Sequence, residues 1–195
     1  MNIGDKFIFK GFEWVALDVT DEAVTAIMTK AWCTEAFDED NYNDWRISSI
    51  RMKLQEELLP VLGEENLITR TVDLVADNGD KRYGTSEDKV WLLTCDDFRK
   101  YREIILQNCD FQDDWWWTLT PWYINGVGYG GNVRYIGLSG DVSYSYAINS
   151  HGVAPACTIN LKSLESAPTG AIRKEIDDLK ERIRKLEEKL QEVKA

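Results

Sequence analysis

The run Trp115-Trp116-Trp117-Thr118-Leu119-Thr120-Pro121-Trp122-Tyr123 decides how the globular part of this 195-residue chain is interpreted. Aromatic and β-branched residues suit the pleated, half-buried surface of a sheet, so the run predicts a strand. The residues that follow, 125–152, carry seven glycines between short apolar stretches, which is typical of short strands joined by turns. The C-terminal part of the globular body is therefore predicted to be rich in strands.

Alternation along these strands predicts which aromatic side chains are buried. Neighbouring side chains of a strand point to opposite faces, so Trp116 should point away from Trp115 and Trp117. At least one of the three should lie in the core. Between residues 142 and 149 every second residue is apolar. This alternation predicts that Tyr144 and Tyr146 belong to the core rather than to a ligand site.

The rest of the body mixes strand and helix patterns. Ser48 or Ser49 can cap a helix that Pro60 ends or kinks, and Asp96 can cap a second helix. Residues 32–45 are acidic and have no regular pattern. Strand patterns occupy residues 3–19 (a hairpin), 24–28, 66–75 and 89–94. Together these patterns predict an α+β domain.

Five segments in order resemble one known family. Trp116 to Pro121 (WWTLTP) and Gly152 to Ala156 (GVAPA) resemble the two halves of a WWLRSP and GVRPA pattern separated by a glycine-rich region. Residues 12–18 (FEWVALD), 43–51 (NDWRISSIR) and 84–93 (GTSEDKVWLL) resemble the opening hairpin, a helix start and a strand of the same family. On these motifs, residues 4–161 resemble the DUF6273 family of bacterial and phage domains.

The resemblance implies a fold and a class of function. It implies a C-type-lectin-like fold, shared with formylglycine-generating-enzyme-like domains, in which a glycine- and aromatic-rich face near the C-terminal end binds ligands. It also implies a bacterial or phage surface-binding protein. Two positions depart from the family pattern, because Leu119 and Ala154 stand where the family has arginine. An arginine at either position could make a buried ion pair or bind a ligand, so the departures are compatible with the scaffold but do not support the family's ligand.

Aromatic, amide and arginine side chains among the glycines are the candidate ligand contacts. Aromatic rings are rigid contact makers that stack on sugars or fill protein pockets, and Asn adds adaptable hydrogen bonds. The alternative is a merely irregular surface. The predicted ligand-binding residues are Trp122, Tyr123, Asn125, Tyr129, Asn132 and Arg134.

The C-terminal segment has the repeat of a coiled coil. Its apolar residues are spaced alternately by four and three, at Ile172, Ile176, Leu179, Ile183, Leu186, Leu190 and Val193. This is the a/d seam of a coiled coil, which a single helix cannot bury alone. Flanking pairs such as Glu175 with Lys180 favour a parallel arrangement. The chain is therefore predicted to associate through this helix, most simply with copies of itself.

The number of helices in the coiled coil can be interpreted in two ways. β-branched residues at a positions with Leu at d favour a dimer. The run Arg182 to Glu188 (RIRKLEE) instead resembles a signature of trimeric coiled coils, in which Arg182 covers the seam and pairs with Glu188 of a neighbouring helix. We expect a homotrimer, with a dimer or docking onto another protein's helix as alternatives.

Composition excludes several classes of function. The chain has a net charge of −11, and the segment 171–195 contributes +1 to it, so the body is strongly acidic. Acidic surfaces argue against binding to nucleic acid or to anionic membranes. No stretch is long enough to span a membrane, and no signal peptide precedes Gly4-Asp5, so the chain is expected to be made in the cytosol.

Catalytic and metal motifs are absent from the sequence. The four cysteines have no metal-binding spacing, and Cys95 and Cys157 are predicted to be buried thiols. The one histidine, His151, is predicted to lie in a solvated turn. The acidic runs 38–40 and 110–114 match no calcium loop and are predicted to be solvated. No enzyme activity, metal or other cofactor is therefore expected; an oxidase-like enzyme is the least favoured alternative.

These patterns combine into one expectation. Residues 1–162 are predicted to form a C-type-lectin-like domain, 163–170 a linker and 171–195 the oligomerisation helix. The expected function is that of a non-enzymatic phage virion accessory or adhesion protein, such as a head fibre, decoration or receptor-binding component. It would display its domain multivalently toward host-surface glycan or protein, and it could contact other virion proteins. The alternatives are a purely structural particle component anchored through the coil and a bacterial surface-binding module.

Overall fold

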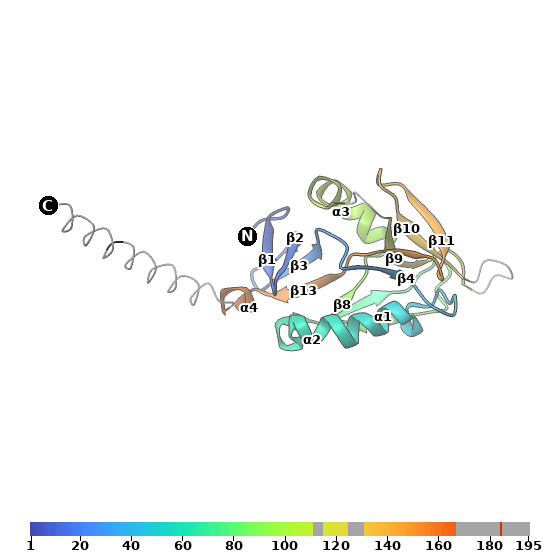
Figure 1. Cartoon of the computed structure of the whole chain (residues 1–195), viewed down its shortest axis with the longest axis horizontal. Helices are drawn as coiled ribbons and strands as arrows, with labels where there is room; N and C mark the ends of the chain where they lie inside the picture. Colours follow the sequence, from blue (N-terminus) through green and yellow to red (C-terminus); the bar gives the residue numbers. More distant parts are fainter. Residues whose placement is uncertain (111–114, 125–130, 167–183, 185–195) are drawn as a thin grey trace, which may run out of the picture. The chain divides into compact units, whose positions relative to one another are not determined.

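The computed structural model describes residues 1–110, 115–124, 131–166 and 184 of the chain (Figure 1). The chain divides into two compact units, Met1–Asn160 and Leu161–Ala195. The first unit has an α+β fold made mostly of sheets with few helices, as predicted. In the described part of the second unit, helix α4 (Leu161–Ser166) occupies the start of the predicted linker. All nine residues predicted to mediate oligomerisation lie outside the described residues.

The first sheet pairs strands from the N-terminal part of the first unit with a strand from its C-terminal end. The predicted hairpin forms from β1 (Lys6–Phe9) and β2 (Phe12–Val19), and the predicted third strand is β3 (Ala23–Met28). Strand β13 (Ala156–Asn160) pairs with β3 in antiparallel register, with Thr158 opposite Thr25. The short strands β5 (Leu67–Ile68) and β8 (Val90–Trp91) also pair with β13. The sheet order is β1-β2-β3-β13-β5.

The second sheet carries the aromatic run. Its order is β11-β10-β9-β12-β4, and the aromatic run forms β9 (Trp116–Pro121) in its middle. Its other strands are β11 (Val142–Tyr146), β10 (Asn132–Ile136), β12 (Ser150–Val153) and β4 (Cys33–Ala36). Strand β4 lies in the segment predicted to be irregular, and its pairing with β12 supplies the order that its own sequence does not indicate. A separate ribbon pairs β6 (Arg70–Asp73) with β7 (Thr85–Asp88).

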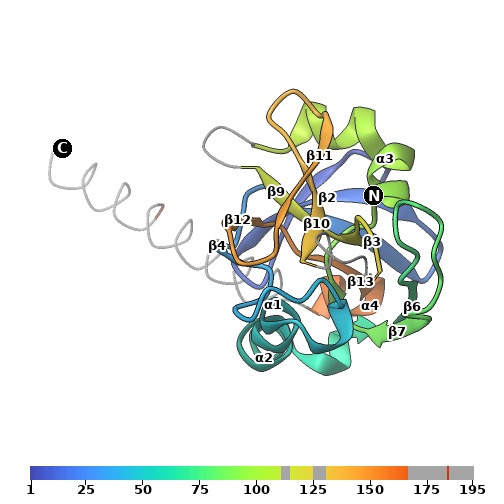
Figure 2. The same cartoon turned by 90° about the vertical axis from the view of Figure 1, so that its right-hand side faces the viewer.

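The first helical segment lies on one side of the sheets, and α3 lies on the opposite side (Figures 1 and 2). Ser48 caps α1 (Ser49–Lys53) by accepting a hydrogen bond from the amide of Arg51, as predicted. The helix then passes through a π-helical turn, η2 (Leu54–Leu58), into α2 (Leu59–Leu62). Pro60 therefore does not end it, because proline is tolerated in the first turn of α2. The short 3₁₀ turns η1 and η3 span Trp45–Ile47 and Glu64–Asn66.

The cap of the second long helix differs from the prediction. Helix α3 (Cys95–Asn108) begins after Thr94, not at Asp96. Thr94 and Asp97 form a reciprocal capping box, in which each side chain accepts a hydrogen bond from the other's backbone amide. This arrangement satisfies two amides that a helix start leaves open. Asp96 instead lies in the first turn and pairs with Arg99 at 2.7 Å.

The tryptophan run contributes to the core as predicted. Trp116 and Trp117 are each 2% exposed, whereas Trp115 is 41% exposed and stacks on Tyr135 with the ring centroids 4.7 Å apart. Trp116 also explains the glycine at position 152, because a Cβ there would approach the indole Cδ1 to 2.7 Å. Leu119 and Ala154, which stand where the DUF6273 pattern has arginine, are buried apolar positions here.

Two predictions of burial were wrong. Tyr144 and Tyr146 are 45% and 54% exposed, because β11 is an edge strand with a neighbour on only one flank. His151 was expected in a solvated turn but lies in β12 and is buried against Trp115 and Trp117.

The acidic run 38–40 is not simply solvated. Asp38 is 4% exposed, and its carboxylate accepts hydrogen bonds from the amides of Asp40, Tyr42 and Ser49. It therefore holds the loop against the start of α1. Residues 111–114 of the second acidic run lie outside the described residues.

Candidate functional site

Three aromatic side chains and one arginine form a patch at the edge of the second sheet, which we call the aromatic patch: Trp122, Tyr123, Tyr144 and Arg134. The ring of Trp122 stacks on the ring of Tyr144, with centroids 3.7 Å apart and planes 23° apart. Tyr123 contacts Trp122 edge to face at 5.4 Å. Tyr123 and Tyr144 remain 37% and 45% exposed. The patch therefore offers ring surfaces to a partner in solution.

Arg134 lies directly behind the stacked rings. It is opposite Tyr144 in the pairing of β10 with β11. Its guanidinium carbon is 5.5 Å from the ring centroid of Trp122 and 5.8 Å from that of Tyr144, within the range of cation–π attraction. Its Nη2 forms an ion pair with Asp77. The arginine thus connects the rings to a carboxylate on a loop far away in the sequence.

The strand pairing that places Arg134 is irregular. Val133 pairs with Pro121 and Tyr135 with Trp117, so β9 carries extra residues opposite Arg134. The hydroxyl of Thr118 donates to the Arg134 carbonyl at 2.8 Å and occupies the acceptor that regular pairing would use. Bulges of this kind redirect side chains and are common beside functional sites.

Side-chain hydrogen bonds fix the backbone that carries Trp122 and Tyr123. The buried side chain of Asn43 donates to the carbonyls of Tyr123 at 2.6 Å and Asn132 at 3.1 Å. Tyr83 donates to the Asn43 amide oxygen at 2.8 Å and thereby orients it. Arg82 donates to the carbonyl of Ile124 at 2.7 Å. Because these donors hold the segment, the rings are presented with little conformational entropy left to lose on binding.

Two buried polar atoms beside the patch lack partners within the described residues. They are the Nε of Arg134 and the Oδ1 of Asn132. Alternation along β10 puts these two side chains on the same face of the sheet. Buried polar groups are normally hydrogen-bonded, so a free donor and a free acceptor on one face are unusual. Both atoms lie beneath the exposed rings, in the polar layer that supports the patch.

The structure brings together three of the six predicted ligand contacts. Trp122, Tyr123 and Arg134 lie in the patch. Asn132 is next to it but only 3% exposed. Asn125 and Tyr129 lie outside the described residues.

The sequence interpretation missed two members of the site. It assigned Tyr144 to the core from the alternation of β11, and it gave no signal for Asp77. The alternation was real, but nothing in a single strand indicates that the strand lies at an edge.

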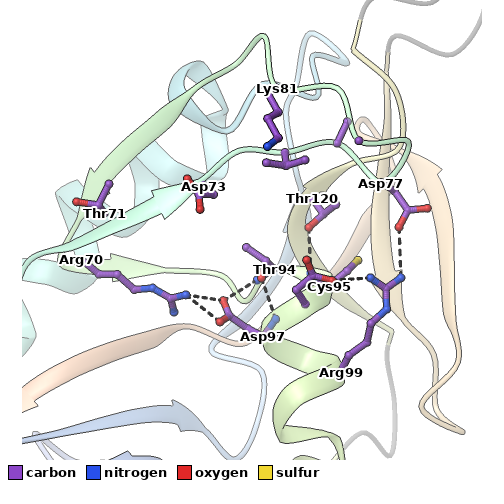
Figure 3. Close-up of a pocket in the computed structure, with 14 residues that line it drawn as sticks. Arg70, Thr71, Asp73, Asp77, Lys81, Thr94, Cys95, Asp97, Arg99 and Thr120 are labelled. Atoms are coloured by element: carbon purple, nitrogen blue, oxygen red, sulfur yellow. Dashed lines mark hydrogen bonds and ion pairs between the residues drawn. The ribbon is translucent and has the colours of Figure 1, made fainter.

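Asp77 is the electrostatic centre of this region. Its carboxylate accepts from Arg134 on the patch side and from Arg99 of α3 at 3.3 Å on the other (Figure 3). Burial opposes its ionisation, but the hydrogen bonds and charges of the two guanidinium groups outweigh burial and hold the pKa of the Asp77 carboxyl below its ordinary value. Asp77 is therefore ionised at neutral pH and keeps Arg134 in place.

The cysteines and the acidic groups of the described residues have no special reactivity of their own in this structure. All four thiols are free, and Cys95 and Cys157 are buried as predicted. Burial raises the pKa of the Cys33 thiol to about 11, which keeps it protonated at neutral pH. Within the described ranges, no group of three or more His, Cys, Asp or Glu side chains could hold a metal ion. The helices of those same ranges include none that is long and apolar enough to cross a membrane.

No protein-family model, curated protein or solved structure matches the chain. The DUF6273 resemblance and the C-type-lectin-like topology thus stay predictions.

Proposed function

We propose that the chain is a non-enzymatic binding protein that uses the aromatic patch to contact a glycan on a host surface. The observation that supports this most directly is the rigid stack of Trp122 on Tyr144, backed by the Arg134–Asp77 ion pair. A preorganised aromatic surface gains contact area without ordering new side chains. The apolar face of a sugar ring is flat and of similar size to a tyrosine ring.

Charge favours a neutral glycan over an anionic one. The positive charge of Arg134 is offset by Asp77, and the chain as a whole carries −11. A protein surface rich in hydroxyl and aromatic groups is the other partner that the patch could accept.

The predicted coiled coil supplies the second part of the proposal. Residues 171–195 would assemble a homotrimer, and linked patches raise the apparent affinity through effective concentration. A weak contact per copy then suffices for attachment. Together with the DUF6273 resemblance, this favours a phage virion accessory or adhesion protein with a C-type-lectin-like domain.

A glycan array with the full-length chain tests the patch. We expect Tyr123→Ala and Tyr144→Ala each to abolish binding to the neutral glycans that the parent chain retains. Tyr42→Ala is the matched control, because Tyr42 is 55% exposed and outside the patch. Loss of binding in the control, or retention in both patch variants, would rule the patch out as the contact surface.

The structural alternative, in which the coil anchors the chain to a particle, makes a different prediction. Chains truncated after Ser166 would then lose incorporation into the particle, and the patch variants would have no effect on attachment to cells. If truncation lowers glycan binding while incorporation is retained, the multivalent binding function is supported.

A further inference from the structure

A cleft opens between β6, residues 75–81 and the first turn of α3 (Figure 3). It has a volume of about 500 Å³, within the range of roughly 300–1,000 Å³ common for small-molecule sites. Thr120 of β9 also lines it. Asp77 lines the cleft and pairs with Arg134 of the aromatic patch, but the aromatic rings of the patch do not line the cleft.

Ion pairs and hydrogen bonds connect the walls of the cleft and fix their positions. Arg70 of β6 donates to both carboxylate oxygens of Asp97, at 2.8 and 3.1 Å. On the other side Arg99 pairs with Asp77. The amide of Cys95 donates to the hydroxyl of Thr120 at 3.0 Å and fixes the floor. A cleft tied on both sides and at its base is preformed and cannot close by simple collapse.

The charges that line the cleft are not all neutralised within it. Five of the seven charged side chains pair with one another as described: Arg70, Asp77, Asp96, Asp97 and Arg99. Asp73 and Lys81 are both exposed and form no ion pair with any residue in the described parts of the chain. Figure 3 shows the two side chains on the same wall, with the Lys81 ammonium extending toward the interior.

We infer that the cleft binds a small zwitterion, a molecule with a free ammonium and a free carboxylate such as an amino acid or a dipeptide. Its carboxylate pairs with Lys81 and its ammonium with Asp73. A purely anionic ligand would face the carboxylates of Asp73, Asp77 and Asp97, and a purely cationic ligand would face Lys81 and two guanidinium groups. Only a molecule with both charges complements the two unpaired side chains at once.

The floor of the cleft is built for binding rather than for reaction. Thr120 is 5% exposed and accepts from Cys95. Its side chain also interacts with the Cys95 thiol, so Thr120 is tied to the start of α3 through both the amide and the side chain of Cys95. The neighbouring Cys95 thiol is buried, which raises its pKa, so it is held as the neutral thiol. The ligand therefore meets no activated nucleophile at the floor of the cleft.

The test is an amide chemical-shift titration of the full chain with L-alanine and with L-alanyl-L-alanine. We expect saturable shifts at the amides of Thr94 to Asp97 for at least one of the two, and the stronger binder distinguishes an amino-acid site from a dipeptide site. The same peptide acetylated at its N-terminus or amidated at its C-terminus should bind about tenfold more weakly, because each form loses one charged hydrogen bond.

Substitutions test whether Asp73 and Lys81 bind the two charged groups of the ligand. Asp73→Asn and Lys81→Gln should each weaken binding about tenfold with an unchanged thermal midpoint, because both side chains are exposed. Asp21→Asn and Lys10→Gln remove exposed charges outside the cleft and should leave binding unchanged.

The site is overturned if neither probe shifts the cleft amides, or if the acetylated, amidated and free peptides bind equally. It is also overturned if both cleft variants bind like the parent chain. Glycan binding by the patch is independent of each of these outcomes.

Discussion

The rings of Trp122 and Tyr144 are stacked with their centroids 3.7 Å apart, although β9, which ends just before Trp122, does not pair with β11, which carries Tyr144. Trp122 follows β9, Tyr144 is on β11, and β10 lies between these strands. Arg134 of β10 fills the space behind both rings. The stack therefore depends on the register of three strands, and changes in any of them should alter it.

Removing one ring of the stack should destabilise the sheet edge modestly. Tyr144→Ala is expected to lower the free energy of unfolding by about 1 kcal/mol, the typical value of an aromatic pair beyond its buried area. Tyr146→Ala is the matched control, because Tyr146 is on the same strand, is 54% exposed and stacks on no described ring. Denaturant unfolding of both variants, with Trp122→Ala to complete a double-mutant cycle, measures the coupling. Equal effects of the two tyrosine substitutions would contradict the stack.

Asp77 should make stability depend on acid pH. Its pKa in the folded state lies below the ordinary value of 3.8, so the unfolded chain takes up the proton first as the pH falls. The stabilisation is present in full above about pH 4 and is lost as the pH falls through the folded-state pKa. Asp77→Asn should therefore be less stable than the parent chain at pH 7, and the difference should shrink below about pH 4.

Thermal midpoints between pH 2 and pH 7 measure this difference for Asp77→Asn. Asp21→Asn, which removes one exposed carboxylate elsewhere on the surface, serves as the matched control. A difference for Asp77→Asn that grows toward acid pH would show that the carboxylate is destabilised in the folded state.

Gly152 should not tolerate a side chain. Its backbone is not in the left-handed region, so the obstacle is steric: an added Cβ would lie 2.7 Å from Cδ1 of the buried Trp116. Because that indole is buried, Gly152→Ala is expected to destabilise the fold by about 2 kcal/mol. The control Gly4→Ala places its methyl in open space at a φ of +87° and reports backbone strain alone. Urea unfolding compares the two, and a smaller loss at Gly152 would mean that the sheet can shift.

Local sequence patterns were sufficient to predict the elements that interactions between neighbouring residues stabilise. The hairpin of β1 and β2 follows from two apolar runs around Lys10-Gly11, both of which adopt positive φ angles in the turn. The cap at Ser48 requires only the amide of Arg51, three residues away. The burial of Trp116 and Trp117 follows from their size and apolar character, since few surfaces leave two adjacent indoles exposed.

Tertiary structure decided what depends on distant partners. Strand β4 becomes a strand because β12 pairs with it across more than a hundred residues of chain. Tyr144 is exposed because β11 is at the sheet edge, which its own alternation cannot reveal. Asp77 joins Arg134 and Arg99 only after the loop 75–81 has folded between β9 and α3. The sequence by itself thus determined the local elements and the aromatic content of the site. The positions of the charged side chains in the site depend on contacts between distant parts of the chain, which only the folded chain specifies.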